Sequence, residues 1–241
     1  MPFTTPQSRL ILPLDTTDAA HARALVTATD GLVGVYKIGL EFVMAGGLSF
    51  AQALAGEGRS VFLDMKLLDI ENTVEGAVRG AGALGADYVT VHAYPQGLQA
   101  AVRVRPEGLQ IIAVTVLTSL DNDDLARAGY QSDAASLVAL RIAEAAAIGV
   151  DCIVCSPEEA AVAHASGLTV ITPGVRLEGD AVGDQKRVAT PQQAIMNGAD
   201  AVVVGRPITQ APDPRAAAER VVAAIAEGLH MREAAAGVAP V

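Results

Sequence analysis

The sequence predicts an α/β protein in which eight parallel strands, separated by helices, close into a (β/α)8 barrel. Three observations favour this fold. Short apolar runs rich in β-branched residues recur along the chain, as expected of parallel strands covered on both faces, and Ala-rich helical stretches separate them. The length of 241 residues is close to the ~250 typical of one such TIM barrel. We therefore expect a single domain over residues 1–241, with a loose tail at 231–241.

The elements alternate in order along the chain. Residues 9–14 form an apolar run that ends at Asp15, and Thr16, Thr17 and Asp18 can cap a helix that extends to about residue 30. The elements that follow are a strand at 33–38, a helix at 41–55, a strand that begins at Val61, a helix at 71–84 and a strand at 88–92. The second half adds strands at 111–116, 150–154, 168–172 and 201–204, with helical stretches that include 133–147 and 212–227. Eight strands favour a closed barrel over an open doubly wound sheet.

Charge and hydropathy exclude several classes of partner. The net charge of −10 and the pI near 4.8 argue against a nucleic-acid or anionic-membrane surface, because no basic patch stands out. An apolar run of the ~18 residues needed to span a bilayer is missing. The first eight residues have neither the basic nor the apolar region of a signal peptide, so we expect a cytoplasmic protein.

Two short motifs look functional, but their context argues against that role. Cys152 and Cys155 form a Cys-x-x-Cys without a second pair or a nearby histidine, so the pattern of a zinc site is incomplete. Their odd offset within an apparent strand puts the sulfurs on opposite faces, and we expect both to pack in the core. The Gly-x-Gly-x-x-Gly pattern at 80–85 lies at a helix end before a strand, which is not the context of a dinucleotide site.

The histidines predict no metal centre. His92 is the only one at a strand end, where we interpret it as a hydrogen-bonded support. His21, His164 and His230 have no partners at ligand spacing. A Gly-x-Ser-x-Gly nucleophile elbow and a Walker loop are also missing from the sequence.

The sharpest chemical signal is the stretch at 61–70, an apolar strand that ends in alternating charges. Side chains alternate along a strand, so Asp64 and Lys66 project to the same side. Asp69 is too far along an extended chain to share that face, and it must either fold back or serve a neighbouring site. The alternative is an ordinary solvated loop between a strand and a helix, because surface ion pairs are common and weak.

Other strand ends carry polar residues, and barrel active sites lie at the C-terminal ends of the strands. These residues are Asp15, Lys37, His92, Thr118-Ser119, Pro173-Gly174-Val175-Arg176 and Gly205-Arg206-Pro207-Ile208. The last two groups follow strands seven and eight, where barrels often bind phosphate through backbone N–H groups. Glycine allows close approach of the backbone and arginine offers a bidentate fork, so we expect a phosphorylated small substrate. Alternatively, the glycines only form turns and the arginines are only solvated.

The charges at the strand ends favour proton donation. A lysine held by carboxylates remains protonated, which suits a proton donor and argues against a Schiff base. A carboxylate such as Asp64 beside a negative substrate group disfavours the ground state, and the repulsion ends if that group leaves as a neutral molecule. Decarboxylation fits this logic, with Lys66 protonating the carbanion that is left.

Several motifs together resemble the bacterial type of orotidine 5′-phosphate decarboxylase. They are Leu14-Asp15, Lys37-Ile38-Gly39, Asp64-x-Lys66-x-x-Asp69-Ile70 with Thr73, Leu117-Thr118-Ser119, Pro173-Gly174-Val175-Arg176, Gly183-Asp184-Gln185 and Gly205-Arg206-Pro207-Ile208. The match spans residues 10–208, and the motifs follow the order of that family. The resemblance implies a homodimeric barrel that converts orotidine 5′-monophosphate to UMP and carbon dioxide, the last step of UMP synthesis, without cofactor or metal.

The resemblance also implies roles for individual residues. Lys66 would donate a proton to C6 of the pyrimidine, and Asp64 would crowd the leaving group. Lys37 and Asp15 would hold ribose hydroxyls, with Lys37 completing the charge network. The pyrimidine would be contacted by Thr118, Ser119 and Pro173. The phosphate and the loop that closes over it would be contacted by Arg176, Gln185, Gly205 and Arg206. The partner subunit's site would be entered by Asp69, Ile70 and Thr73. Residues 177–183 would form the closing loop.

Two alternatives remain from the sequence. One is a magnesium-dependent sugar-phosphate decarboxylase or aldolase of the same superfamily, which shares the Asp-x-Lys-x-x-Asp motif. Those enzymes present an acidic metal ligand on strand two, where this chain has Lys37, a cation that would repel magnesium. The other is a catalytically silent phosphate-binding barrel, which would not need the full set of charges.

Overall fold

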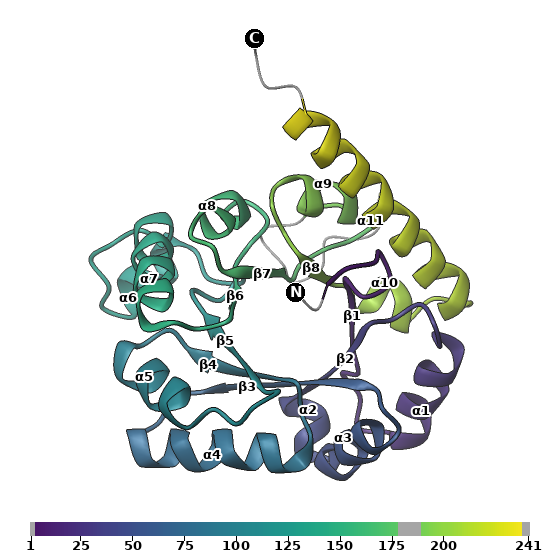
Figure 1. The fold of residues 1–241 in the computed structure, drawn as a ribbon, viewed down its shortest axis with the longest axis horizontal. Helices are drawn as coiled ribbons and strands as arrows, with labels where there is room; N and C mark the ends of the chain where they lie inside the picture. Colours follow the sequence, from purple (N-terminus) through teal and green to yellow (C-terminus); the bar gives the residue numbers. More distant parts are fainter. Residues whose placement is uncertain (1–2, 178–188, 238–241) are drawn as a thin grey trace.

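The computed structural model describes residues 3–177 and 189–237. Eight parallel strands close into a barrel in chain order, and β8 pairs with β1. Helices surround the strands on the outside, as Figure 1 shows. The (β/α)8 TIM barrel expected from the sequence is confirmed.

The strands begin and end close to the predicted positions. They are β1 (Leu10–Pro13), β2 (Val35–Gly39), β3 (Ser60–Leu67), β4 (Tyr88–His92), β5 (Gln110–Val114), β6 (Cys152–Val154), β7 (Thr169–Thr172) and β8 (Ala201–Val203). The helices are α1 (Ala19–Ala28), α2 (Leu40–Met44), α3 (Gly47–Gly56), α4 (Glu71–Leu84), α5 (Pro95–Val104), α6 (Asn122–Arg127), α7 (Ala134–Ile148), α8 (Ala160–Ala165), α9 (Pro191–Met196), α10 (Arg206–Thr209) and α11 (Pro214–Gly237).

The barrel interior is filled by one buried layer of side chains, to which every strand contributes. Its members are Ile11, Val35, Phe62, Tyr88, Ile112, Cys152, Ile171 and Ala201. Phe3 stacks on Tyr88 with ring centroids 6.0 Å apart and so adds to this layer. Neighbouring strand residues point outward into the core beneath the helices, and Cys155 belongs to that outer core. The two cysteine side chains therefore lie in different cores, as their spacing predicted.

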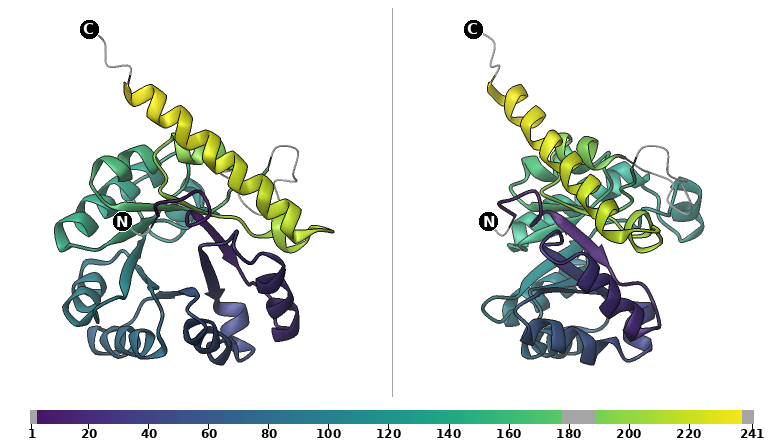
Figure 2. Two further views of the ribbon diagram at one scale, coloured as in Figure 1. Left: turned by 45° about the vertical axis from the view of Figure 1, so that its right-hand side comes forward. Right: turned by 90° about the vertical axis from the view of Figure 1, so that its right-hand side faces the viewer.

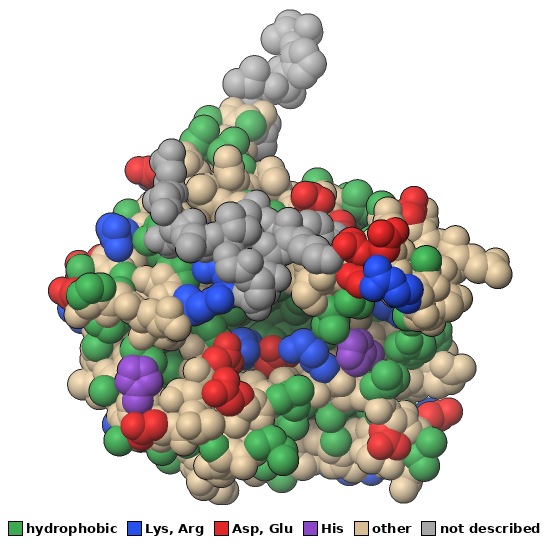
Figure 3. All heavy atoms as spheres, turned by 180° about the vertical axis from the view of Figure 1, so that it is seen from behind, with side chains coloured by type: hydrophobic (Ala, Val, Ile, Leu, Met, Phe, Trp, Pro, Cys, Tyr) green, Lys and Arg blue, Asp and Glu red, His purple; other side chains and the backbone are tan. Residues whose placement is uncertain are grey.

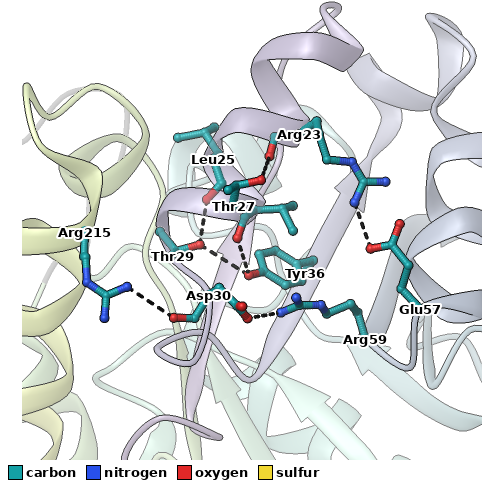
Figure 4. Close-up of polar contacts among 10 residues, drawn as sticks. Arg23, Leu25, Thr27, Thr29, Asp30, Tyr36, Glu57, Arg59 and Arg215 are labelled. Atoms are coloured by element: carbon teal, nitrogen blue, oxygen red, sulfur yellow. Dashed lines mark hydrogen bonds and ion pairs between the residues drawn. The ribbon is translucent and has the colours of Figure 1, made fainter.

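Polar contacts join the first elements of the chain to the last helix (Figure 4). Thr29, which caps α1, lies with its hydroxyl 3.3 Å from the Tyr36 hydroxyl in β2. Asp30 forms an ion pair with Arg59, the residue before β3. Its backbone carbonyl also accepts a hydrogen bond of 3.4 Å from Arg215 of α11. These contacts help to hold the barrel closed where α1 and α11 meet.

Two predicted segments differ from the structure. The single helix expected at 41–55 is broken into α2 and α3, because Gly46 adopts a φ of +91°, which an L side chain rarely adopts. The loose tail expected at 231–241 is helical as far as Gly237, since α11 continues beyond the barrel (Figure 2). Within the described parts of the chain, none of the helices combines the length and hydropathy needed to cross a bilayer.

Candidate active site

A cavity of about 620 Å³ opens at the C-terminal ends of the strands. Figure 3 shows basic and acidic side chains gathered around a hollow on the face opposite to that of Figure 1. The residues predicted from the sequence that line the cavity are Asp15, Lys37, Asp64, Lys66, Thr118, Ser119, Pro173, Arg176, Gly205 and Arg206. The structure therefore brings the end of β3 together with the loops that follow β5, β7 and β8.

Four of these side chains form a chain of alternating charge. Lys37 Nζ lies 3.3 Å from Asp15 Oδ1 and 3.2 Å from Asp64 Oδ2. Lys66 Nζ lies 2.8 Å from Asp64 Oδ1. The central carboxylate thus holds one lysine on each oxygen, and the expected closeness of Asp64 and Lys66 is present.

The middle of this chain of charges is well shielded from solvent. The side chains of Lys37 and Asp64 are 9% and 14% exposed, whereas that of Lys66 is 33% exposed. Burial alone would lower the pKa of Lys37, but the negative charges of Asp64 and Asp15 outweigh it and raise this pKa. Burial alone would raise the pKa of Asp64, but Lys37 and Lys66 lower it below its ordinary value. Both Lys37 and Asp64 are therefore ionised at neutral pH.

The strand bends where it carries these charges. Pairing between β3 and β4 shifts register between Leu63 and Leu67, which indicates a bulge. Lys66 has a φ of +48°, and no other described non-glycine residue has a positive φ. A left-handed conformation costs such a residue about 1–3 kcal/mol and clusters at functional sites. The backbone at Lys66 is thus held in an unfavourable conformation at the cavity.

Asp69, Ile70 and Thr73 lie apart from this chain of charges. All three are exposed, and none of them lines the cavity of its own chain. The carboxylate of Asp69 instead accepts a hydrogen bond of 2.7 Å from the backbone N–H of Ile70. Of the two possibilities left by the sequence, folding back toward Lys66 is therefore not observed.

The turns after β7 and β8 bring backbone close to the cavity. Gly174 has a φ of +74°, and the Arg176 N–H donates a hydrogen bond of 3.0 Å to the carbonyl of Ala189. A Cβ on Gly205 would lie 3.0 Å from Pro13 Cγ, so this glycine permits close packing of β8 against β1. Gln185, and the predicted closing loop beyond Leu177, lie outside the described residues.

Comparison with known proteins decides the family. The family model described as "Orotidine 5'-phosphate decarboxylase / HUMPS family" matches residues 8–221. The chain belongs to this family. A protein of Afipia carboxidovorans named orotidine 5'-phosphate decarboxylase is 55% identical over 227 residues, which cover 92% of this chain and 97% of that protein. One of Methylorubrum extorquens strain PA1, of the same name, is 56% identical over 221 residues, covering 90% and 95%.

Two solved structures support the same fold. The crystal structure of orotidine 5'-phosphate decarboxylase from Lactobacillus acidophilus superposes with a TM-score of 0.78 at 30% identity, covering 90% of this chain and 98% of that one. A conserved protein of Geobacillus kaustophilus, titled uncharacterized, gives a TM-score of 0.75 at 29% identity, with 90% and 99% covered. The family expected from the sequence motifs is confirmed.

Some residues of this decarboxylase-family site carry no signal in the sequence. Glu41, Thr209 and Gln210 also line the cavity, although none of them lies in a motif that we recognised. Glu41 lies on α2, directly after β2, and Thr209 and Gln210 lie at the end of α10, after β8. Among the described residues, no three His, Cys, Asp or Glu side chains are grouped so that they could hold a metal ion.

A buried arginine braces the segment that leads to Thr118 and Ser119. Arg141 of α7 donates one hydrogen bond to the carbonyl of Thr115 and another, of 3.2 Å, to the Tyr130 hydroxyl. Its guanidinium carbon lies 5.0 Å from the centroid of the Tyr94 ring. In the sequence, this role is signalled only by Arg141 itself, a single arginine among the apolar residues of the helix predicted at 133–147.

His92, which we interpreted as a support, lies outside the cavity. It is partly buried at the end of β4. Burial, and then the positive charges of Arg141 and Lys66, lower the pKa of His92 below its ordinary value. The imidazole is therefore neutral at pH 7.

Proposed function

We propose that Lys66 and Asp64 carry the chemical step in the decarboxylation of orotidine 5′-monophosphate to UMP and carbon dioxide, the reaction to which family membership assigns this chain. Relatives of that name are more than half identical to it. The observation that supports the two roles is the shielded Asp64 carboxylate with a lysine on each oxygen. The cytoplasmic location expected from the sequence belongs to the same proposal.

The step uses the charges of both residues. Asp64 is ionised because its lysine partners lower its pKa, so it repels a substrate carboxylate placed beside it. The bond between C6 and the carboxylate breaks, carbon dioxide leaves as a neutral molecule, and the electron pair remains on C6. The neighbouring Lys66 ammonium stabilises this carbanion and then donates a proton from Nζ to C6. The neutral amine regains its proton from water.

The rest of the cavity would place the substrate. Lys37 and Asp15 would hold the ribose hydroxyls from the ends of β2 and β1. The pyrimidine would lie among Thr118, Ser119 and Pro173, and the phosphate would meet Arg176, Gly205 and Arg206, with Gln185 in the same group. Support comes from the cavity itself, since these residues apart from Gln185 surround one space of about 620 Å³. No cofactor or metal takes part in these roles.

We place a second copy of the chain at the edge of the site. Asp69, Ile70 and Thr73 would enter the partner subunit's cavity, which gives a role to residues that are exposed in the single chain. Exposed apolar side chains support a dimer interface, because Met44 at the end of α2 is 86% exposed and Ile70, which precedes α4, is 73% exposed. Leu68, which is 59% exposed, adds to this apolar surface.

The test is the loss of orotidine 5′-monophosphate absorbance in the presence of EDTA. We expect wild-type protein to turn over substrate with the chelator present and Lys66→Ala to lose turnover by at least ~1,000-fold. The matched control is Arg220→Ala, which removes an exposed cation on α11 away from the cavity and should leave turnover unchanged. Turnover that requires added magnesium, or that survives in Lys66→Ala, would contradict the proposal.

A further inference from the structure

Thr90 connects the two residues that we place at the reacting centre. It lies on β4, beside β3, and is only 1% exposed. The backbone N–H of Lys66 donates a hydrogen bond of 2.8 Å to Thr90 Oγ1. The Thr90 hydroxyl in turn donates a hydrogen bond of 3.1 Å to Asp64 Oδ1. The hydroxyl thus donates its single proton to Asp64 and accepts, through a lone pair, the hydrogen bond from the backbone N–H of Lys66.

The place of Thr90 in the sheet explains why this hydroxyl is needed. Leu63 pairs with Val89 and Leu67 with Val91, so the three residues from Asp64 to Lys66 face only Thr90. Regular pairing between β3 and β4 is interrupted over the bulge. The Thr90 side chain supplies the acceptor that the backbone N–H of Lys66 uses there.

The contact falls on a residue with an unfavourable backbone conformation. Lys66 has a φ of +48°, and such conformations persist only where the surroundings hold them in place. Three hydrogen bonds join the Lys66 N–H, Thr90 Oγ1, Asp64 Oδ1 and Lys66 Nζ in a row, and the covalent bonds of Lys66 close them into a ring. The ring turns Oδ1 of Asp64 toward Lys66 and leaves Oδ2 for Lys37, 3.2 Å away.

We propose that Thr90 is a positioning residue for the decarboxylation, holding the Lys66 backbone and the Asp64 carboxylate in their reactive arrangement. This inference rests on the roles proposed for Lys66 and Asp64. Thr90 does not line the cavity, so it acts through these two residues and not through the substrate. Loss of its hydroxyl lowers kcat because Lys66 Nζ moves relative to C6, and a displacement of about 1 Å can cost on the order of 100-fold in rate.

The test compares two substitutions at the same position. Thr90→Val keeps the shape of the side chain and removes the hydroxyl, and we expect kcat to fall about 10- to 100-fold while KM changes less than about 3-fold. Thr90→Ser keeps the hydroxyl and should return kcat to within about 3-fold of wild type. Thr29→Val is the matched control, because Thr29 is fully buried at the end of α1, away from the cavity. It should reduce stability without changing kcat.

A double substitution separates this inference from the roles on which it rests. If Thr90 acts through Lys66 and Asp64, then adding Thr90→Val to Lys66→Ala should reduce turnover by a smaller factor than Thr90→Val does in the wild-type protein. Wild-type kcat in Thr90→Val, or equal losses in Thr90→Val and Thr90→Ser, would overturn the role of Thr90 even if Lys66→Ala is inactive. An active Lys66→Ala would instead overturn the proposed chemistry. If Thr90→Val does not fold, Thr90→Cys, with a weaker hydrogen-bonding group, should give a kcat between those of wild type and the expected valine variant.

Discussion

Lys66 Nζ lies 2.8 Å from Asp64 Oδ1, although one residue separates the two along β3. Alternation along a strand puts both side chains on one face, and the bulge and the left-handed backbone at Lys66 accompany this contact. Because the other oxygen of Asp64 meets Lys37, a single carboxylate pairs with two lysines, and Asp15 is the second carboxylate beside Lys37. The charge balance of the cavity therefore depends on Asp64.

Asp64→Asn should lower the free energy of unfolding at pH 7 by about 3 kcal/mol, because it leaves the buried Lys37 ammonium with only Asp15 as its partner. Urea unfolding followed by circular dichroism measures this change. Asp69→Asn is the matched control: it makes the same substitution at an exposed carboxylate and should change stability by less than about 0.5 kcal/mol. Equal stability of wild type and Asp64→Asn would show that the carboxylate does not stabilise the fold.

A comparison of wild type and Asp64→Asn also tests how the free energy of unfolding depends on pH. The folded pKa of Asp64 is below its unfolded value, so its contribution is complete above about pH 4 and is lost as the pH falls through the folded pKa. The stability difference between wild type and Asp64→Asn should therefore shrink in acid. The pKa of Lys37 is raised, so its contribution is lost only as the pH rises through a folded value above about 10.4. A difference that grows below pH 4 would contradict this assignment.

The sequence predicts those parts of the site that depend on the alternation of side chains along a strand and on the positions of the strand ends. Asp64 and Lys66 are two residues apart on one strand, so their shared face is a local property. Lys37 lies within β2, two residues before its end, and Asp15 lies just after β1, and a closed barrel brings the ends of neighbouring strands to one rim. The alternation of side chains and the meeting of strand ends at one rim were therefore enough to predict the cluster of charges in a barrel.

The remaining features depend on distances that alternation does not determine. Thr90 meets Lys66 only because the register of β3 and β4 shifts at the bulge. Arg141 reaches Thr115 from a helix that follows it in the chain, and helical periodicity does not specify that contact. Gly46 breaks a helix through its own backbone angle, although the residues around it have a helical pattern.

Gly39→Ala should weaken substrate binding without unfolding the protein. Its φ of −97° is open to alanine, but a Cβ there would lie 3.1 Å from Asp15 Oδ1 and 3.2 Å from Lys37 Nζ. Both groups must move by a few tenths of an ångström, so we expect KM for orotidine 5′-monophosphate to rise about 3- to 10-fold. Steady-state kinetics measures this, with Gly56→Ala as the control, because a Cβ on Gly56 meets nothing within 4 Å. An unchanged KM would argue against Asp15 and Lys37 as ribose contacts.

Arg141→Met should loosen the segment that carries Thr118 and Ser119. The substitution removes the hydrogen bond to the Thr115 carbonyl and the contact of the guanidinium with the Tyr94 ring. We expect a loss of about 2–3 kcal/mol in the free energy of unfolding, together with a higher KM. Arg127→Met is the control, since the Arg127 side chain is 77% exposed. If the two variants unfold at the same urea concentration, Arg141 does not brace this segment.

Mixing two inactive variants should restore activity if the site is shared between subunits. Lys66→Ala removes the proposed proton donor, and Asp69→Ala removes the residue proposed to enter the partner's cavity. In a mixed dimer one site carries both substitutions and the other carries neither. Random exchange makes half of the dimers mixed, so an equal mixture should recover about a quarter of wild-type turnover.

Subunits must be exchanged for this recovery, by dilution or mild denaturant followed by refolding. The control is a mixture of Lys66→Ala with Asp64→Ala, which act in the same chain's cavity and leave no mixed dimer with an intact site. Recovery in the first mixture alone supports a composite site, because only residues from different chains can complement each other. If neither mixture recovers although mass spectrometry shows mixed dimers, Asp69 acts within its own chain and the exposed position of its side chain changes on substrate binding.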